Sequence, residues 1–167
     1  MSQLHTDHEE EDEQKDKYLT FNLGEESYGI EIRYVTEIVG IQDITVVPEV
    51  PQYIKGIINL RGQIIPVMDV RLRFKKPFQP YNDRTCIIVV QIGQIDIGLI
   101  VDKVAEVVSI PNSNIVPPPE FTQVNNRYIQ GIGKLEEEVK LLLDCNKLIH
   151  EQESILIEQM EVQNSRH

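Results

Sequence analysis

The feature of this sequence that most constrains its fold is an internal repeat. Residues 21–41 align with residues 90–110 at a constant offset of 69, without a gap. The identical pairs in this alignment include Gly24 and Gly93, Gly29 and Gly98, Val35 and Val104, Glu37 and Glu106, and Val39 and Val108. After a six-residue insertion the offset becomes 75, and residues 53–57 then match residues 128–132. Agreement at so many positions predicts a tandem duplication of one structural unit.

Within each copy, apolar and polar residues alternate as they do in half-buried strands. Residues 19–23 and 28–32 show this alternation on either side of a polar turn. Each copy spans about 65 residues with roughly five short strands, and a lone unit of that size is marginally stable. Closing five strands into a barrel removes exposed edges, and packing two barrels together supplies the missing core. We therefore expect an all-β fold with short helices: a first barrel at 17–78, a second at 79–147, and a C-terminal helix with a frayed tail at 148–167.

The charge of the chain excludes several kinds of partner. The formal net charge is −11 over 167 residues, which disfavours nucleic acids because phosphate binding needs a basic surface. Residues 1–17 hold seven acidic side chains against two lysines, so we expect residues 1–16 to form a disordered acidic tail. Cys86 and Cys145 lack a CxxC spacing and are expected to be free thiols. The absence of a signal-peptide pattern or a long apolar run predicts a cytoplasmic protein without direct membrane insertion.

A search for catalytic residues finds almost no candidate. His5 and His8 fall in the acidic tail and His167 is the last residue, so only His150 lies near predicted structure. A Ser–His–Asp or Cys–His arrangement therefore lacks a base. The sequence also has no glycine-rich phosphate loop and no cluster of His and Cys suited to zinc. These observations predict no enzyme activity, no metal site and no cofactor.

Comparing the copies separates residues that the fold requires from residues that are free to serve function. Asp69 and Asp144 are equivalent and each precedes a predicted short helix, so N-capping explains both better than an acid–base pair. Arg61 and Gly62 have glutamates as counterparts, which places a single cation at a hairpin tip. Arg61 is either a solvated turn residue or a partner contact whose planar fork of donors suits carboxylates. Gly98 recurs in the first copy and is either architectural or the floor of a groove.

Several runs of residues resemble the family of CheW-like domains. The longest is Asn59–Arg71, NLRGQIIPVMDVR, which is similar to the family signature NLRGxIIPVxDLR and departs from it around Met68 and Val70. Further similar runs are YIKGI at 53–57, YGIEI at 28–32, VTEI at 35–38, GLIVDKV at 98–104, YIQGIG at 128–133 and LLD at 142–144. The resemblance covers about residues 17–150, and the combination of runs is far more specific than any single one.

The resemblance implies both a fold and a function. The implied fold is two five-stranded SH3-like barrels packed together, in agreement with the duplication. The implied function is that of an adaptor, or scaffold, that couples chemoreceptors to the histidine kinase CheA and so regulates the kinase, without catalysis of its own. Its implied partners are the hairpin tip of the cytoplasmic chemoreceptor helices and the regulatory domain of CheA. Such an adaptor is expected to be a monomer alone, to form higher-order arrays with partners, and to reach membrane receptor arrays through them.

The resemblance also implies binding residues. A receptor helix is expected to dock in a groove between the barrels. The implied groove residues are Val35, Glu37, Ile38, Lys55, Gly56, Arg61, Cys86, Gly98 and Val104. For Val104 and Cys86, burial in the core explains the residue nearly as well as partner contact. The kinase-facing surface is expected on the first barrel, with the candidate residues Ile41, Gln42 and Asp43.

Two other classes of function stay open at this point. Small barrels often bind nucleic acids, but the acidity and the lack of aromatic stacking pairs disfavour that function. A hydrolase with an unrecognised site is disfavoured by the scarcity of histidines in the predicted folded region.

Overall fold

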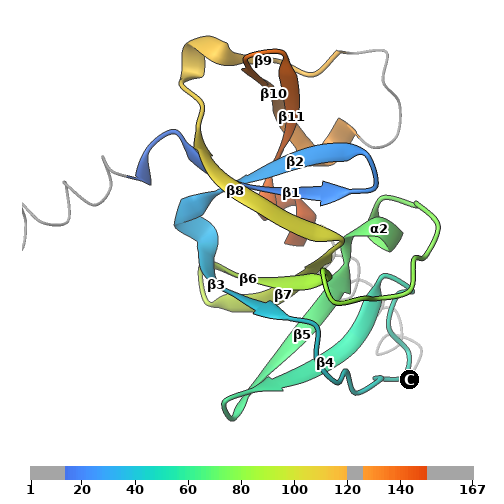
Figure 1. The fold of residues 1–167 in the computed structure, drawn as a ribbon. Coiled ribbons are helices and arrows are strands. Elements are labelled where there is room, and N and C mark those ends of the chain that lie inside the picture. The colour runs from blue at the N-terminus through green and yellow to red at the C-terminus, as the bar shows by residue number, and fades with distance from the viewer. Residues whose placement is uncertain (1–13, 120–125, 150–167) are drawn as a thin grey trace, which may run out of the picture.

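The computed structural model describes residues 14–119 and 126–149 (Figure 1). Residues 1–13 of the predicted acidic tail lie outside these ranges. The strands are β1 (Lys17–Leu23), β2 (Glu26–Glu31), β3 (Val35–Gly40), β4 (Ile54–Leu60), β5 (Gln63–Asp69), β6 (Cys86–Ile92), β7 (Ile95–Val101), β8 (Lys103–Ser109), β9 (Ile115–Val116), β10 (Ile129–Leu135) and β11 (Glu138–Leu143). The short helices are η1 (Ile32–Tyr34), α2 (Val70–Arg73), η2 (Asn112–Asn114) and η3 (Asn126–Tyr128).

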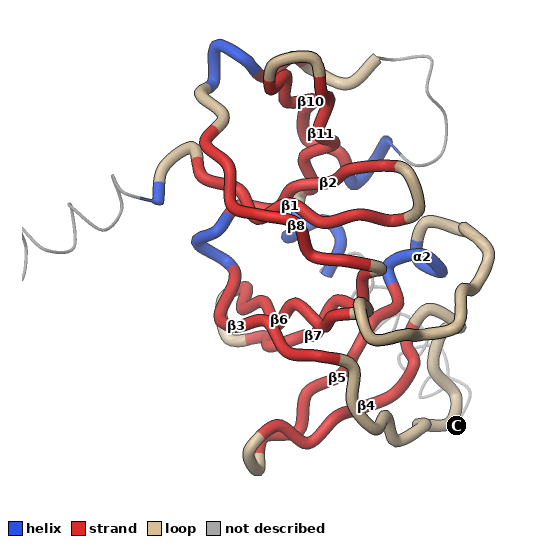
Figure 2. The backbone as a smooth tube through the Cα atoms, in the orientation of Figure 1, coloured by secondary structure: helices blue, strands red, loops and turns tan. Residues whose placement is uncertain are grey.

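The strands form two sheets, and each sheet curls into a small barrel (Figures 1 and 2). One sheet has the order β3-β6-β7-β5-β4 and is called barrel I here. The other has the order β8-β1-β2-β11-β10-β9 and is called barrel II. Both sheets are mainly antiparallel, but β5 runs parallel to β7 in barrel I and β11 runs parallel to β2 in barrel II. The predicted all-β fold of two small barrels with short helices is confirmed.

The division of the chain between the barrels differs from the prediction. Barrel I combines β3, β4 and β5 of the first copy with β6 and β7 of the second, and barrel II combines β1 and β2 with β8 to β11. The boundaries 17–78 and 79–147 therefore mark the sequence repeats and not the barrels. The leading hairpins of the two copies, β1–β2 and β6–β7, have equivalent apolar patterns, so each fits the sheet of the other copy. Asp102 is the one residue between β7 and β8, so the crossing from one barrel to the other is short.

Each sheet closes because the chain leaving one edge strand returns to the opposite edge. After β8 the chain forms η2 and β9, and Val116 of β9 pairs with Ile132 of β10. After β3 the bridge between Thr45 and Ile57 of β4 has the same role in barrel I, with hydrogen bonds of 2.9 Å in both directions. This closure limits the length of strand edge open to pairing with other chains.

The largest hydrophobic core lies between the barrels. Among the described residues it holds twenty buried side chains. Phe21 and Ile30 of barrel II face the equivalent Val90 and Leu99 of barrel I within it. Seven buried residues form a second core inside barrel I, and three form a third inside barrel II. Since burial of apolar area is the main source of folding free energy, each barrel depends on the other for much of its stability.

The C-terminal helix contributes to this shared core. It begins at Cys145, and its described part covers residues 145–149. Leu148 and Ile149 are buried in the core between the barrels, so the helix docks on both barrels. The rest of the predicted C-terminal segment, from residue 150 onward, lies outside the described residues. Within the described residues, no helix combines the length and the hydropathy needed to cross a membrane.

Candidate functional site

Arg61 of the predicted site lies at the tip of the β4–β5 hairpin. Arg61 and Gly62 form its two-residue turn with φ angles of 54° and 87°, as the tight hairpin turns with two positive φ angles require. The Gly62 N–H donates to Asn59 Oδ1 at 2.8 Å. The guanidinium of Arg61 donates to the carboxylate of Glu37 in β3, and this hydrogen bond raises the pKa of Arg61. The predicted position at an exposed tip is confirmed, since the Arg61 side chain is 71% exposed; the pairing with Glu37 was not predicted.

Two exposed apolar side chains accompany this ion pair. Ile38 follows Glu37 in β3 and is 43% exposed, and Ile64 near the tip in β5 is 57% exposed. Their equivalents in barrel II, Val107 and Val139, are exposed to a similar degree. Because this exposure recurs in both copies, it follows from the shared strand plan, and the feature that distinguishes barrel I is the Arg61–Glu37 pair. The tip surface is defined here as Glu37, Ile38, Arg61 and Ile64.

Lys55 and Gly56 lie at the opposite end of β4 from Arg61, about 20 Å away at the usual rise of a strand. The Lys55 ammonium is 4.9 Å from the ring centroid of Phe78, in the segment that links the two copies. Gly56 has a φ of 145°, and a Cβ atom there would lie only 2.0 Å from the Thr45 carbonyl oxygen. Gly56 is therefore required by a close backbone approach inside barrel I. These two predicted residues do not form one cluster with the tip surface.

The seam between the barrels is filled by side chains. Val35, Cys86 and Val104 are partly buried and pack against the core between the barrels. Gly98 is buried in β7, where a Cβ atom would lie 2.6 Å from Cγ2 of Ile87. The missing side chain of Gly98 therefore makes room inside barrel I, so the architectural explanation of this glycine holds. The part of Gly98 in a receptor groove stays a prediction.

The predicted kinase-facing residues follow β3. Ile41 packs against the core inside barrel I, and its N–H donates to the Thr85 carbonyl at 3.3 Å. Gln42 and Asp43 are exposed. This loop therefore presents polar side chains to solvent while its isoleucine anchors it to the barrel. Its contact with a kinase stays a prediction.

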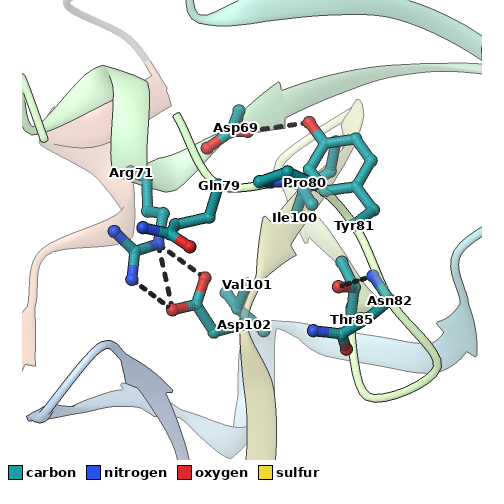
Figure 3. Close-up of a pocket in the computed structure, with 10 residues that line it drawn as sticks. All are labelled: Asp69, Arg71, Gln79, Pro80, Tyr81, Asn82, Thr85, Ile100, Val101 and Asp102. Atoms are coloured by element: carbon teal, nitrogen blue, oxygen red, sulfur yellow. Dashed lines mark hydrogen bonds and ion pairs between the residues drawn. The ribbon is translucent and has the colours of Figure 1, made fainter. Parts of the chain in front are cut away.

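A second polar cluster, which the sequence did not reveal, joins the two copies (Figure 3). Arg71 of α2 donates from Nε to both carboxylate oxygens of Asp102, at 2.7 and 2.9 Å, and from Nη2 at 2.6 Å. The Gly24 N–H donates to the same carboxylate at 2.7 Å. Burial raises the pKa of Asp102, but these hydrogen bonds outweigh burial and leave the pKa below its ordinary value. Arg71 and Asp102 are separated by 31 residues, and no motif spacing relates them.

The pocket beside this pair is small and its acidic groups already have partners. Its volume is about 100 Å³. The Tyr81 hydroxyl donates to Asp69 at 2.7 Å, and burial together with this bond raises the pKa of Tyr81. Asp69 also accepts from the Leu72 N–H, and Asp144 accepts from the Lys147 N–H, so the capping prediction is confirmed for both aspartates. The residues that line the pocket therefore connect helix α2 to the segment that links the two copies.

The other candidate reactive groups show no cooperating arrangement in the part of the chain that the structure describes. Burial raises the pKa of the Cys145 thiol to about 12, which makes this thiol a poor nucleophile. No group of three or more metal-binding side chains is found among the described residues. The tip surface, by contrast, presents a charged pair and exposed apolar side chains to solvent.

Comparisons with known proteins identify the family of the chain. The family model described as "CheW-like domain" matches residues 17–153. The chain is similar to the chemotaxis protein CheW of Klebsiella aerogenes, with 38% identity over 85% of this chain and 86% of that protein. It is similar to the chemotaxis protein CheW of Treponema pallidum, with 33% identity over 81% of this chain and 82% of that protein.

A solved structure gives the same result. The scaffolding protein TtCheW from Thermoanaerobacter tengcongensis superposes with a TM-score of 0.75 and 40% identity, over 80% of this chain and 91% of that one. The range matched by the family model contains all the strands of both barrels. On these grounds the chain belongs to the family of CheW-like domains.

Proposed function

We propose that this chain is a chemotaxis scaffold that couples chemoreceptors to the histidine kinase CheA and thereby regulates the kinase, through protein contacts and without catalysis of its own. The relatives named chemotaxis protein CheW and the neighbour titled scaffolding protein support this role. The observation that carries it is the tip surface, where the Arg61–Glu37 pair is accompanied by exposed isoleucines on strands β3 and β5. The scaffold works in the cytoplasm and reaches membrane receptor arrays only through its partners.

The tip surface suits a helical partner of modest affinity. Arginine is enriched among the residues that dominate binding, because its planar guanidinium makes directional hydrogen bonds while its stem packs on apolar atoms. Glu37 holds Arg61 in one orientation before binding, which lowers the entropy lost on contact. Ile38 and Ile64 supply exposed apolar area on β3 and β5. A receptor hairpin whose helices carry an apolar stripe and a carboxylate would match this surface.

The remaining predicted receptor residues extend this contact in different ways. Val35 and Val104 lie at the rim of the filled seam, where they are partly exposed, so the receptor helix rests on the seam and does not enter it. Lys55 provides a second cation at the far end of β4. Gly56, Gly98 and the partly buried Cys86 act indirectly by shaping the barrel beneath. The loop carrying Ile41, Gln42 and Asp43 is the proposed contact with the kinase regulatory domain. These contacts are small, so dissociation constants are expected to be roughly micromolar, as in transient signalling complexes.

Charge reversal at Arg61 tests this function. Arg61→Glu should leave the melting temperature within about 2 °C of the parent, because an exposed ion pair contributes little to stability, and should weaken receptor binding at least about tenfold. Binding is measured by titrating a soluble chemoreceptor hairpin, with thermal melts on the same preparation. Arg84→Glu is the matched control, since Arg84 is also an exposed arginine and lies just before β6 of barrel I.

A charge-swapped double variant shows what Arg61 contributes. Glu37→Arg with Arg61→Glu rebuilds the ion pair in reverse. If Arg61 itself contacts the partner, the swapped protein binds as poorly as Arg61→Glu alone. Recovery of parental binding would mean that only the pair matters and would defeat the direct role of Arg61. Parental binding by the single variant would defeat the proposal for the whole tip surface.

A further inference from the structure

Arg73, the last residue of α2, lies between two tyrosine rings. Its guanidinium carbon is 4.5 Å from the ring centroid of Tyr53 and 4.5 Å from that of Tyr128. The two tyrosines are equivalent in the repeat: Tyr53 directly precedes β4 of barrel I, and Tyr128 directly precedes β10 of barrel II. Arg73 therefore touches both barrels at the same structural point of each.

The same two tyrosines hold the two helix caps. The Asp69 N–H donates to the Tyr53 carbonyl at 2.7 Å, and the Asp144 N–H donates to the Tyr128 carbonyl at 2.7 Å. Asp69 caps α2, and Asp144 caps the helix that begins at Cys145. A movement of either tyrosine away from Arg73 consequently disturbs the backbone hydrogen bond at that barrel's helix.

The Arg73 contact differs from the apolar core beside it, because it is polar and some of its N–H donors lack hydrogen-bond acceptors among the described residues. Nε and Nη2 of Arg73 are buried and have no hydrogen-bond partner among the residues that the structure describes. Buried donors of a charged group that lack an acceptor destabilise a fold, and stacking on aromatic rings offsets only part of that cost. The equivalent residue in the second copy is Leu148, which is fully buried in the core. The fold therefore accepts an apolar side chain at this place and does not require a cation.

We propose that Arg73 is a built-in weak point of the seam, where the two barrels part locally and reclose. In the closed arrangement the guanidinium is stacked between the tyrosines. In the open arrangement it leaves the rings, its two unpaired N–H groups reach water, and both cap hydrogen bonds lose their support. Such a local equilibrium lets the barrels adjust their relative position without unfolding. The inference requires no partner, so it stands or falls separately from the proposed function.

The test replaces Arg73 by methionine, whose unbranched side chain follows a similar path and packs well against aromatic rings. Arg73→Met should raise the melting temperature by about 3–8 °C, because it removes two buried N–H donors that lack an acceptor among the described residues. It should also slow amide hydrogen exchange at Asp69 and Asp144 by about tenfold, and by a similar factor at each, as measured by NMR. Arg33→Met is the matched control, because Arg33 also lies over a tyrosine ring, at 4.8 Å, but is 61% exposed. The control should change neither quantity.

Several results would overturn this inference. A lower melting temperature in Arg73→Met would make Arg73 a net stabiliser of the seam. Unchanged or faster exchange at the two aspartate amides would show that no opening passes through Arg73. Slowing at one amide alone would show that the two tyrosines do not move together. Arg73→Lys keeps the charge but loses the planar stacking, so it should lower the melting temperature; an increase would also contradict the proposal.

Discussion

Barrel I and barrel II share one strand plan but fill their interiors differently. In barrel I, Ile58, Ile65 and Val89 are buried in the barrel's own core. The equivalent residues of barrel II are Gly133, Lys140 and Thr20. Barrel II thus has far less apolar volume of its own, and its stability depends more heavily on the core that it shares with barrel I. Two barrels with the same strand plan therefore need not hold equal cores, because the core shared between them can stabilise the barrel that has the smaller one.

The polar residues inside barrel II are tolerated because they have partners. The Lys140 ammonium, on a residue that is only 7% exposed, donates to the Ser27 hydroxyl at 3.0 Å and pairs with Glu138 at 3.0 Å. The Thr20 hydroxyl donates to the Glu106 carbonyl at 2.7 Å and accepts from the Glu106 N–H at 3.2 Å. Hydrogen bonds in barrel II thus occupy places where barrel I has aliphatic packing, as the cost of burying unpaired polar groups requires.

The largest predicted effect comes from separating the two copies. Residues 1–78 alone and residues 79–167 alone should each lack cooperative unfolding, because each barrel takes strands from both copies. Circular dichroism melts of each fragment measure this. Mixing the fragments should restore a cooperative transition by rebuilding both barrels at once. A fragment that folds cooperatively by itself would contradict the exchanged-hairpin arrangement.

A smaller effect is expected from adding one methyl group at equivalent glycines. Gly56→Ala in barrel I should lower the free energy of unfolding by about 3 kcal/mol, because the new atom meets the Thr45 backbone at a positive φ. Gly131→Ala in barrel II should cost only about 1 kcal/mol, since its nearest neighbour is a side-chain methyl of Ile115 at 2.7 Å. Urea unfolding of both variants gives the difference. Equal losses of unfolding free energy would show that the neighbouring chain approaches this glycine equally closely in both barrels.

The smallest effect tests the Arg71–Asp102 ion pair, which the equivalent residues do not form. The equivalents of Asp102 and Arg71 are Arg33 and Asn146, and Asn146 donates instead to the Tyr34 hydroxyl at 3.4 Å. Asp102→Asn should lower stability at pH 7 by about 1–2 kcal/mol through loss of charge-assisted hydrogen bonds.

The pH dependence of this loss has a definite sign. Because folding lowers the pKa of Asp102, its contribution is complete above the unfolded pKa and disappears as pH falls through the lower folded pKa. Unfolding curves of parent and variant should therefore converge at a pH below the folded pKa of Asp102. If the difference in free energy of unfolding persists undiminished at that pH, the Arg71–Asp102 pair stabilises the fold through packing and not through charge.

Much of the fold followed from the repeat in the sequence. The repeat and its strand alternation predicted two small barrels, and the equivalence of Asp69 and Asp144 predicted two capped helices. The partners of β1–β2 and β6–β7 were not predictable, because the two hairpins carry equivalent patterns and either sheet satisfies them. Only the three-dimensional structure shows that the hairpins are exchanged.

The candidate site was predictable to a lesser degree. The asymmetry between the copies singled out Arg61 at a hairpin tip, where the structure places it. Its pairing with Glu37 depends on a contact across 24 residues, for which sequence spacing has no signal. Gly98 is explained by close packing inside barrel I, and sequence alone left this open because a glycine in an apolar strand marks such packing as readily as space outside the barrel. No sequence pattern singled out Arg73, although its counterpart Leu148 is buried.

Reconstitution of signalling tests the central claim most directly. Purified chain, a chemoreceptor hairpin assembled in membrane vesicles and CheA are combined, and autophosphorylation of the kinase is measured with ATP. The account predicts that kinase activity becomes receptor-dependent only when the chain is present, and that Arg61→Glu abolishes this dependence while Arg84→Glu preserves it. Kinase activity that does not respond to the chain, with all three components folded, would contradict the account.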